Sequence, residues 1–288
     1  MSDFHIRIMQ KDELNLALEW ASEEGWNPGL NDATCYYQAD PDGFLVGVLN
    51  DEIIACIAAL KYSNEFAFIG FYLVKPEYRG QGFGIKIWQA ALDYLQGCNI
   101  GLDGVTAQQA NYQASGFQLA YSNVRYQGKV PPMLPSLTGQ HNAKDQIVSL
   151  NQVDFNQLAR FEKDFFPCER NNFLSEWIKQ KNSHALAYFV EDNLVGYGVI
   201  RQCREGYKVA PLFADSPVIA DALLLGLLAG TSVGDSYYLD VPECHQAGLM
   251  LAKKMSMEPV FTTARMYTSE IPQLPLGRIY GVTSFEIG

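Results

Sequence analysis

Apolar residues recur along this chain in two periods, which predict a mixture of strands and helices. Short alternating or continuous apolar runs indicate strands, and apolar residues at i, i+3, i+4 and i+7 indicate helices that bury one face. In the first half we predict strands at residues 4–9, 43–49, 53–61, 66–74, 99–105 and 117–127, and helices at 11–24, 107–115 and after the glycines at 80–84.

A similar order of elements follows in the second half. We predict strands at residues 185–190, 194–201, 207–213, 237–241, 259–267 and 278–287, and helices at 151–166, 218–229 and 244–255. Residues 129–144 between the halves are rich in Pro, Gly and polar residues and have no periodicity, which is typical of a linker. We therefore predict domains at 1–128 and 145–288, joined by a linker at 129–144.

Three landmarks repeat at similar distances along the chain. Leu73 and Leu212 are 139 positions apart, and Leu102-Asp103 and Leu239-Asp240 are 137 apart. Arg125 and Arg265 are 140 apart. Such similar offsets, each near half the chain length, indicate an internal duplication.

A glycine-rich turn between a strand and a helix predicts an anion site. The sequence Arg79-Gly80-Gln81-Gly82-Phe83-Gly84 follows an apolar strand and precedes an amphipathic helix. The first N–H groups of a helix have no partner within it, and the helix dipole favours negative charge there. We therefore expect a phosphate-bearing ligand at this turn.

Two well-known phosphate motifs do not fit the turn. A P-loop needs GxxxxGK[ST], and residues 82–87 provide neither that spacing nor a Ser or Thr. A dinucleotide-binding GxGxxG should follow the first strand of a βαβ unit, whereas this strand follows a hairpin. The pattern [Q/R]xxGx[G/A] after a fourth strand is satisfied by Arg79, Gly82 and Gly84.

With this turn, residues 4–128 resemble the GNAT superfamily of N-acetyltransferases. The resemblance rests on Leu73-Val74, the Arg79–Gly84 turn and the later Tyr112-x3-Gly116-Phe117. The second half is similar to the divergent partner domain of tandem GNAT proteins. The resemblance implies an α+β fold with mixed sheets: two tandem acyl-CoA N-acyltransferase-like domains, each a mostly antiparallel sheet flanked by helices.

The resemblance also implies acetyl-CoA as cosubstrate and assigns residues to it. The pyrophosphate would lie on the amides of Gly80, Gln81, Gly82, Phe83 and Gly84, next to Arg79. The pantetheine arm would pair like an extra strand with Leu73 and Val74 of a splayed fourth strand. An acceptor amine would then attack the thioester directly.

For catalysis, the resemblance places Tyr112 as the acid that protonates the leaving thiolate. A packed aromatic residue is the alternative for this position. The general base has no clear counterpart, because Phe68, the position where many relatives have a Glu, cannot accept a proton. The amine could lose its proton through waters or to Asp103, Glu24 or Asp32. Among these carboxylates we select Asp103, although its recurrence as Asp240 fits a structural role equally well. No metal ligands are predicted.

In the second half, the counterpart of the glycine turn is Ala214-Asp215-Ser216-Pro217. It has no glycine, Pro217 lacks an N–H, and Asp215 would repel a pyrophosphate. We expect Asp215 to cap its own helix and this half not to bind CoA in the usual way.

The composition of the chain limits the classes of partner that we expect it to bind and the compartment in which we expect it. The net charge is −11, and residues 1–128 hold 15 acidic against 7 basic side chains, which argues against nucleic-acid binding and is compatible with a cationic acceptor. No apolar run is long enough to span a membrane, and no secretory signal is evident. Six scattered cysteines suggest a reducing compartment, so we predict a cytoplasmic location.

We therefore expect an N-acetyltransferase acting on a primary amine of a small molecule or peptide. A CoA-binding or regulatory module without transferase activity is the alternative, motivated by the absent strand-four carboxylate. A scaffold that binds no nucleotide is the third option and leaves the glycine turn unexplained. The acceptor and the oligomeric state stay open, with a homodimer as one option.

Overall fold

The computed structural model describes residues 3–134 and 145–288, and its strands join into one mixed sheet. Within these residues the 13-stranded sheet has the order β1-β2-β3-β4-β5-β12-β6-β11-β10-β9-β8-β7, with β13 paired to β10. All pairs are antiparallel except β4 with β5 and β10 with β11. The predicted mixed, mostly antiparallel fold is confirmed.

In the first half, the predicted strands and helices are present. They are β1 (Phe4–Ile8), α1 (Leu14–Glu23), β2 (Phe44–Leu49), β3 (Glu52–Lys61), β4 (Phe66–Val74), α3 (Phe83–Tyr94), β5 (Asn99–Val105), α4 (Gln109–Ala114) and β6 (Gln118–Lys129). A further helix, α2 (Asp32–Ala39), was not predicted, because its eight residues form no continuous apolar stripe.

The second half repeats this order with three differences from the prediction. Its elements are β7 (Asp145–Ser149), α5 (Phe155–Glu162), α6 (Asn171–Trp177), β8 (Ser183–Val190), β9 (Asn193–Gln202), β10 (Tyr207–Ala214), α7 (Pro217–Leu228), β11 (Ser236–Pro242), α8 (Gln246–Lys254), β12 (Glu258–Tyr267) and β13 (Ile279–Gly281). Strand β7 and helix α6 were not predicted. The predicted strand at 278–287 is wrong beyond residue 281, where the chain leaves the sheet.

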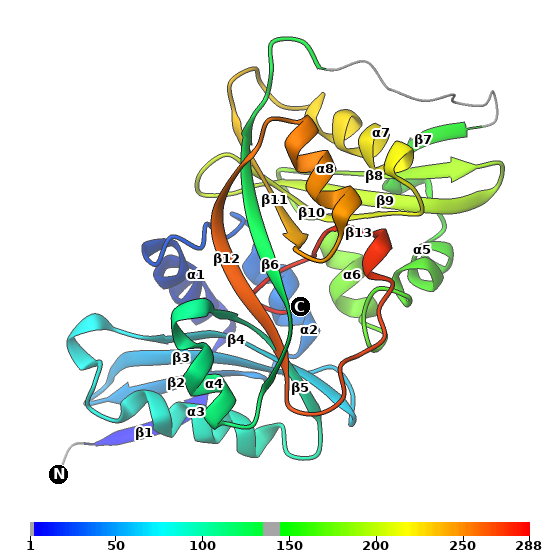
Figure 1. Cartoon of the computed structure of the whole chain (residues 1–288). Coiled ribbons are helices and arrows are strands. Elements are labelled where there is room, and N and C mark those ends of the chain that lie inside the picture. Colours follow the sequence, from blue (N-terminus) through cyan, green and yellow to red (C-terminus); the bar gives the residue numbers. More distant parts are fainter. Residues whose placement is uncertain (1–2, 135–144) are drawn as a thin grey trace.

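The last long strand of each half pairs with the other half. Strand β12 of the second half lies between β5 and β6, and β6 of the first half lies between β12 and β11. Figure 1 shows β6 and β12 side by side through the centre of the molecule. Of the predicted linker, Lys129 ends β6 and residues 130–134 follow it, while 135–144 lie outside the described residues.

Strand alternation divides the apolar residues between the two faces of the sheet. In β3, Cys56, Ala58 and Leu60 join a core that includes α1, α2, α5 and α6. The alternate residues of β3 join a separate core under α3. The first core spans both halves, and there the rings of Tyr36 and Trp177 stack with centroids 5.9 Å apart.

No helix in the described part of the chain is long and apolar enough to cross a membrane.

Candidate active site

Strands β4 and β5 separate halfway along their length. They pair in parallel from Phe66 opposite Asn99 to Ile69 opposite Leu102, and β5 then continues to Val105 paired only with β12, on its other edge. Phe71 has a φ of 48°, and the register of β4 on β3 shifts there, which is a β-bulge. The bulge turns the end of β4 away from β5 and leaves a wedge-shaped opening between them.

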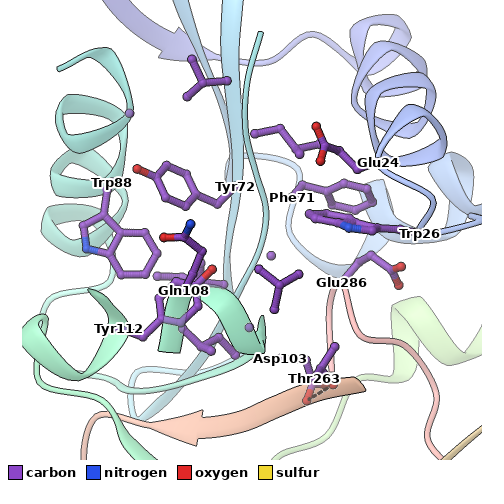
Figure 2. A pocket seen from close by; sticks show the side chains of 18 of the residues that line it. Glu24, Trp26, Phe71, Tyr72, Trp88, Asp103, Gln108, Tyr112, Thr263 and Glu286 are labelled. Atoms are coloured by element: carbon purple, nitrogen blue, oxygen red, sulfur yellow. Dashed lines mark hydrogen bonds between the residues drawn. The ribbon is translucent and has the colours of Figure 1, made fainter. Parts of the chain in front are cut away.

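A pocket of about 520 Å³ fills this opening. Its walls come from both halves of the chain, and Figure 2 shows its side chains from close by. In that view Tyr72, Trp88 and Tyr112 lie on one side, and Phe71, Trp26 and Glu286 lie on the other. The pocket also reaches Leu73, Val74, Arg79, Gly80, Gly82 and Gly84.

The glycine turn lies at one end of the pocket and has the geometry of an anion site. Gly80 and Gly82 have φ values of 75° and 83°, a left-handed conformation that glycine adopts without a Cβ penalty. A Cβ at either position would meet no atom of the described residues within 4 Å, so these residues leave the space above the turn open. Gly82 is the N-cap of α3, whose first N–H groups are therefore available to a bound anion.

The other predicted residues of the turn hold it in place. Arg79 Nε donates to the carbonyl of Val74 at 2.8 Å, and its guanidinium forms an ion pair with Glu24 after α1. Gln81 Nε2 donates to the carbonyl of Glu77 at 2.8 Å. The ring of Phe83 is buried against the ring of Phe4, with centroids 4.9 Å apart. Arg79 thus ties the turn to the end of β4 and to α1.

Tyr112 projects from α4 into the pocket opposite the end of β4. Its ring lies beside Trp88, with centroids 5.7 Å apart, and passes over Gly104, where a Cβ would be 2.2 Å from Tyr112 Cε2. Burial, with a smaller effect from the nearby Tyr72 hydroxyl, raises the pKa of Tyr112 to about 12. The phenol therefore keeps its proton at neutral pH, as a general acid must.

Asp103 lines the same pocket, but Arg265 of β12 engages its carboxylate. Arg265 Nε donates to Oδ1 at 3.0 Å, and Nη2 donates to Oδ2 at 2.5 Å. Asn123 Nδ2 also donates to Oδ1 at 2.8 Å. Both oxygens are therefore occupied, and the side chain is fully buried.

The two other acidic residues considered from the sequence are also paired. Glu24 lies at the pocket mouth with Arg79. Asp32 does not line the pocket: it is buried on α2, where Arg201 Nε donates to it at 2.8 Å. The structure thus brings Tyr112, Asp103 and the glycine turn together, and leaves Asp32 outside.

The remaining wall consists mostly of residues that the sequence did not single out. Trp26, in the loop after α1, is joined there by Phe261, Thr263, Phe285 and Glu286 of the second half. No local motif marks these four residues. They reach the pocket because of the strand exchange and because the chain after β13 crosses to the first half.

In the second half, the corresponding opening is filled by the chain itself. Strand β10 pairs with β11 only from Tyr207 to Val209, and β13 then pairs with β10 at Leu212 and Phe213. The N-cap of α7 is Ser216, and Asp215 pairs with Arg278 at 2.7 Å, so the expectation that Asp215 caps the helix is wrong.

Comparisons with known proteins agree with both halves of this description. The profile described as "Acetyltransferase (GNAT) family" matches residues 12–117, and "Acetyltransferase (GNAT) domain" matches residues 158–281. Holothin acyltransferase of Pseudoalteromonas sp. (strain SANK 73390) is 30% identical over 281 residues, which cover 96% of this chain and 92% of that protein.

Solved structures share the fold along nearly the whole chain. A putative acetyltransferase from Pyrococcus horikoshii superposes with a TM-score of 0.81 at 22% identity, covering 99% of this chain and 96% of that one. A tandem GNAT protein from the clavulanic acid biosynthesis pathway has a TM-score of 0.66 at 11% identity and covers 94% and 100%. The chain therefore belongs to the GNAT superfamily of acyltransferases, with two GNAT units in tandem.

Proposed function

We propose that this protein transfers the acetyl group of acetyl-CoA to a primary amine of a small molecule or peptide. The observation that carries the proposal is the opening between β4 and β5, which leads from an open glycine turn to Tyr112. In this proposal the domain at residues 1–128 holds the donor, and the domain at 145–288 completes the acceptor wall.

The donor fits the chain's own groups along the opening. The backbone N–H groups of Gly80, Gln81, Gly82, Phe83 and Gly84 would donate hydrogen bonds to the pyrophosphate oxygens. Past the bulge, no strand of the described residues pairs with Leu73 and Val74 on the β5 side. Their backbone groups, apart from the Val74 carbonyl that accepts from Arg79, can therefore pair with the amides of the pantetheine arm. Acetyl-CoA is a substrate here and supplies the activated thioester.

Tyr112 is the proposed acid for the leaving group. The amine attacks the acyl carbon directly, the carbon–sulfur bond breaks, and the Tyr112 hydroxyl protonates the sulfur. The raised pKa of Tyr112, about 12, suits this role because the proton is held until negative charge develops on sulfur.

For Asp103 we propose a structural role in place of the general-base role that its position suggests. A base must present a free lone pair to the proton it removes. The hydrogen bonds from Arg265 and Asn123 occupy both carboxylate oxygens. A proton placed on Asp103 would also remove the counter-charge of the buried Arg265 guanidinium.

The side of the pocket where the acceptor would bind favours an amine attached to a flat apolar group. Trp26, Phe261 and Phe285 contribute aromatic surface, and Glu24 and Glu286 add negative charge that attracts a cationic amine. By its name, the bacterial relative acts on holothin. The present chain shares 30% of its residues with that protein, so its own acceptor needs a direct screen.

Calorimetry and thiol release test the proposal. Acetyl-CoA should bind the wild-type protein, and Gly82→Glu should abolish that binding by placing a carboxylate where the pyrophosphate lies. Gly97→Ala, at another glycine of positive φ outside the pocket, is the matched control for backbone strain. Absence of acetyl-CoA binding to the wild type, or unchanged binding by Gly82→Glu, would contradict the proposal.

A CoA-binding module without transferase activity is the second candidate. It is favoured by one observation: the β4 positions Phe68 and Gly70 carry no acidic group. A panel of primary amines, including aromatic amines, separates the two candidates. Binding of acetyl-CoA without amine-dependent thiol release would favour the module.

We propose a cytoplasmic location, because all six cysteines are free thiols, as is usual in a reducing compartment. A small-molecule or peptide amine is the proposed partner, with no role for nucleic acid or membrane. Size-exclusion chromatography with light scattering would establish whether the protein is a monomer or a homodimer.

A further inference from the structure

The segment 282–288, which follows β13, crosses from the second half to β4 of the first. Val282 N donates to the carbonyl of Asp240 at 2.9 Å, so the segment begins on β11. Tyr62 Oη donates to the carbonyl of Ile287 at 2.8 Å, and Arg170 Nη1 donates to the carbonyl of Gly288 at 2.7 Å. The segment is therefore held at both ends.

Gly70 lets this segment lie directly on β4. A Cβ at Gly70 would be 1.8 Å from the backbone oxygen of Glu286, a distance that no side chain can accommodate. Farther along, Gly288 lies over the ring of Phe68. Residues 286–288 thus cover the part of β4 that has no acid of its own and place Glu286 in the pocket wall.

The Glu286 carboxylate is held through one oxygen and leaves the other free. Ser284 Oγ donates to Oε2 at 2.5 Å, and Tyr36 Oη donates to the same oxygen at 3.3 Å. Oε1 accepts no hydrogen bond from the part of the chain that the structure describes. Asp103 differs, because hydrogen bonds occupy both of its oxygens.

Charged groups from several elements surround Glu286. Arg125 of β6 and Lys208 of β10 each interact electrostatically with it, and Tyr36 of α2 does so as well. Burial and the charge of Arg125 lower the pKa of Lys208, and Glu286 partly offsets this. Arg125, Lys208 and Tyr36 are therefore the charged or titratable groups that face this carboxylate from the elements packed against it.

We propose that Glu286 is the proton acceptor for the attacking amine, a catalytic residue supplied by the second half of the chain. The inference rests on the proposed function. As the nitrogen–carbon bond forms and the carbon–sulfur bond breaks, one nitrogen proton passes to Glu286 Oε1 and Tyr112 gives its proton to sulfur. Solvent then returns a proton from Glu286 to the Tyr112 phenolate, which restores both groups. An amine that arrives as ammonium first loses its extra proton to solvent.

The test compares Glu286→Gln with the wild type over a range of pH. Gln keeps the side-chain shape and an oxygen that can accept from Ser284 and Tyr36, but it cannot take a proton. We expect kcat/KM for the amine to fall about 10²–10⁴-fold. We also expect the variant to lose the acidic limb of the pH profile, which is the fall of the wild-type kcat/KM as the pH is lowered. The Kd for acetyl-CoA should stay within about twofold. Glu23→Gln, which removes an exposed carboxylate outside the pocket, should leave the rate unchanged.

Three results would overturn the assignment. The first is wild-type kcat/KM in Glu286→Gln, and the second is a rise in KM alone with the acidic limb retained, which means binding without proton transfer. If Glu286→Gln does not fold, Glu286→Asp decides. The Asp carboxylate is one methylene farther back, so we expect kcat/KM to fall about tenfold or more while the acidic limb of the pH profile is retained. A wild-type rate in Glu286→Asp is the third contrary result. A wild-type protein that binds acetyl-CoA but releases no thiol refutes the transferase function itself.

Discussion

Asp103 and Arg265 come from opposite halves of the chain and meet as a buried, bidentate ion pair between β5 and β12. Asp240 and Arg125 form the same pair with the halves reversed, between β11 and β6. The duplicated landmarks in the sequence are therefore partners across the two halves. This arrangement follows from the exchange of β6 and β12, because each strand carries its arginine into the other half.

The strand exchange predicts that neither half folds alone. Without β12, residues 1–134 would expose the edges of both β5 and β6, and without β6, residues 135–288 would expose those of β11 and β12. We expect each fragment to aggregate when it is expressed by itself and the two to form a complex when they are co-expressed. Co-purification with a tag on one fragment measures this. A soluble, monomeric first fragment with cooperative unfolding would contradict the prediction.

The Arg125–Asp240 pair should contribute to stability in a way that depends on both partners. Asp240→Leu leaves Arg125 buried without its carboxylate and should lower the free energy of unfolding by about 3–5 kcal/mol. The double variant with Arg125→Met should recover much of the loss, because no unpaired charge remains. Urea denaturation measures both. Glu169→Gln, in an exposed ion pair with Lys163, is the control and should change little.

The same pair should give acid-dependent stability. Burial acts to raise the pKa of Asp240, but the charge and hydrogen bonds of Arg125 outweigh it, so the pKa lies below its ordinary value. A lowered folded-state pKa stabilises the fold above the unfolded pKa, about 3.9, and this contribution is lost as pH falls toward the folded value. The stability difference between wild type and Asp240→Asn should therefore be constant from about pH 7 to 5 and shrink below about pH 4. A difference that grows on acidification would contradict this.

Much of the first half could be predicted from the sequence because its signals are local. The boundaries of β4 and β5 follow from apolar periodicity, and the glycine turn from its residue types. The strand exchange and the position of Glu286 could not be predicted, because they depend on pairings between residues far apart in the chain. Residues 278–287 are apolar enough for a strand, yet only Ile279–Gly281 pair, because the rest of the segment crosses to β4.

One molecule of acetyl-CoA should bind per chain, although the chain has two GNAT units. Strand β13 occupies the opening of the second half, and Pro217 removes an N–H at the start of α7. Titration calorimetry should give a stoichiometry of one for the wild type and no residual binding for Gly82→Glu. A stoichiometry of two, or residual binding in the variant, would show that the ligand displaces β13 from the opening of the second half.

Tyr112→Phe should lower turnover without weakening acetyl-CoA binding. The variant keeps the ring against Trp88 and over Gly104 but has no proton to give, so kcat should fall about 10²–10⁴-fold with Kd unchanged. Because the pKa of Tyr112 is raised to about 12, the wild-type rate should show no loss from this group up to about pH 11. Thiol release from pH 6 to 10 in both proteins measures this, and Tyr126→Phe, a tyrosine outside the pocket, is the control. A wild-type kcat in Tyr112→Phe would remove the phenol from the mechanism and leave the thiolate to depart unprotonated.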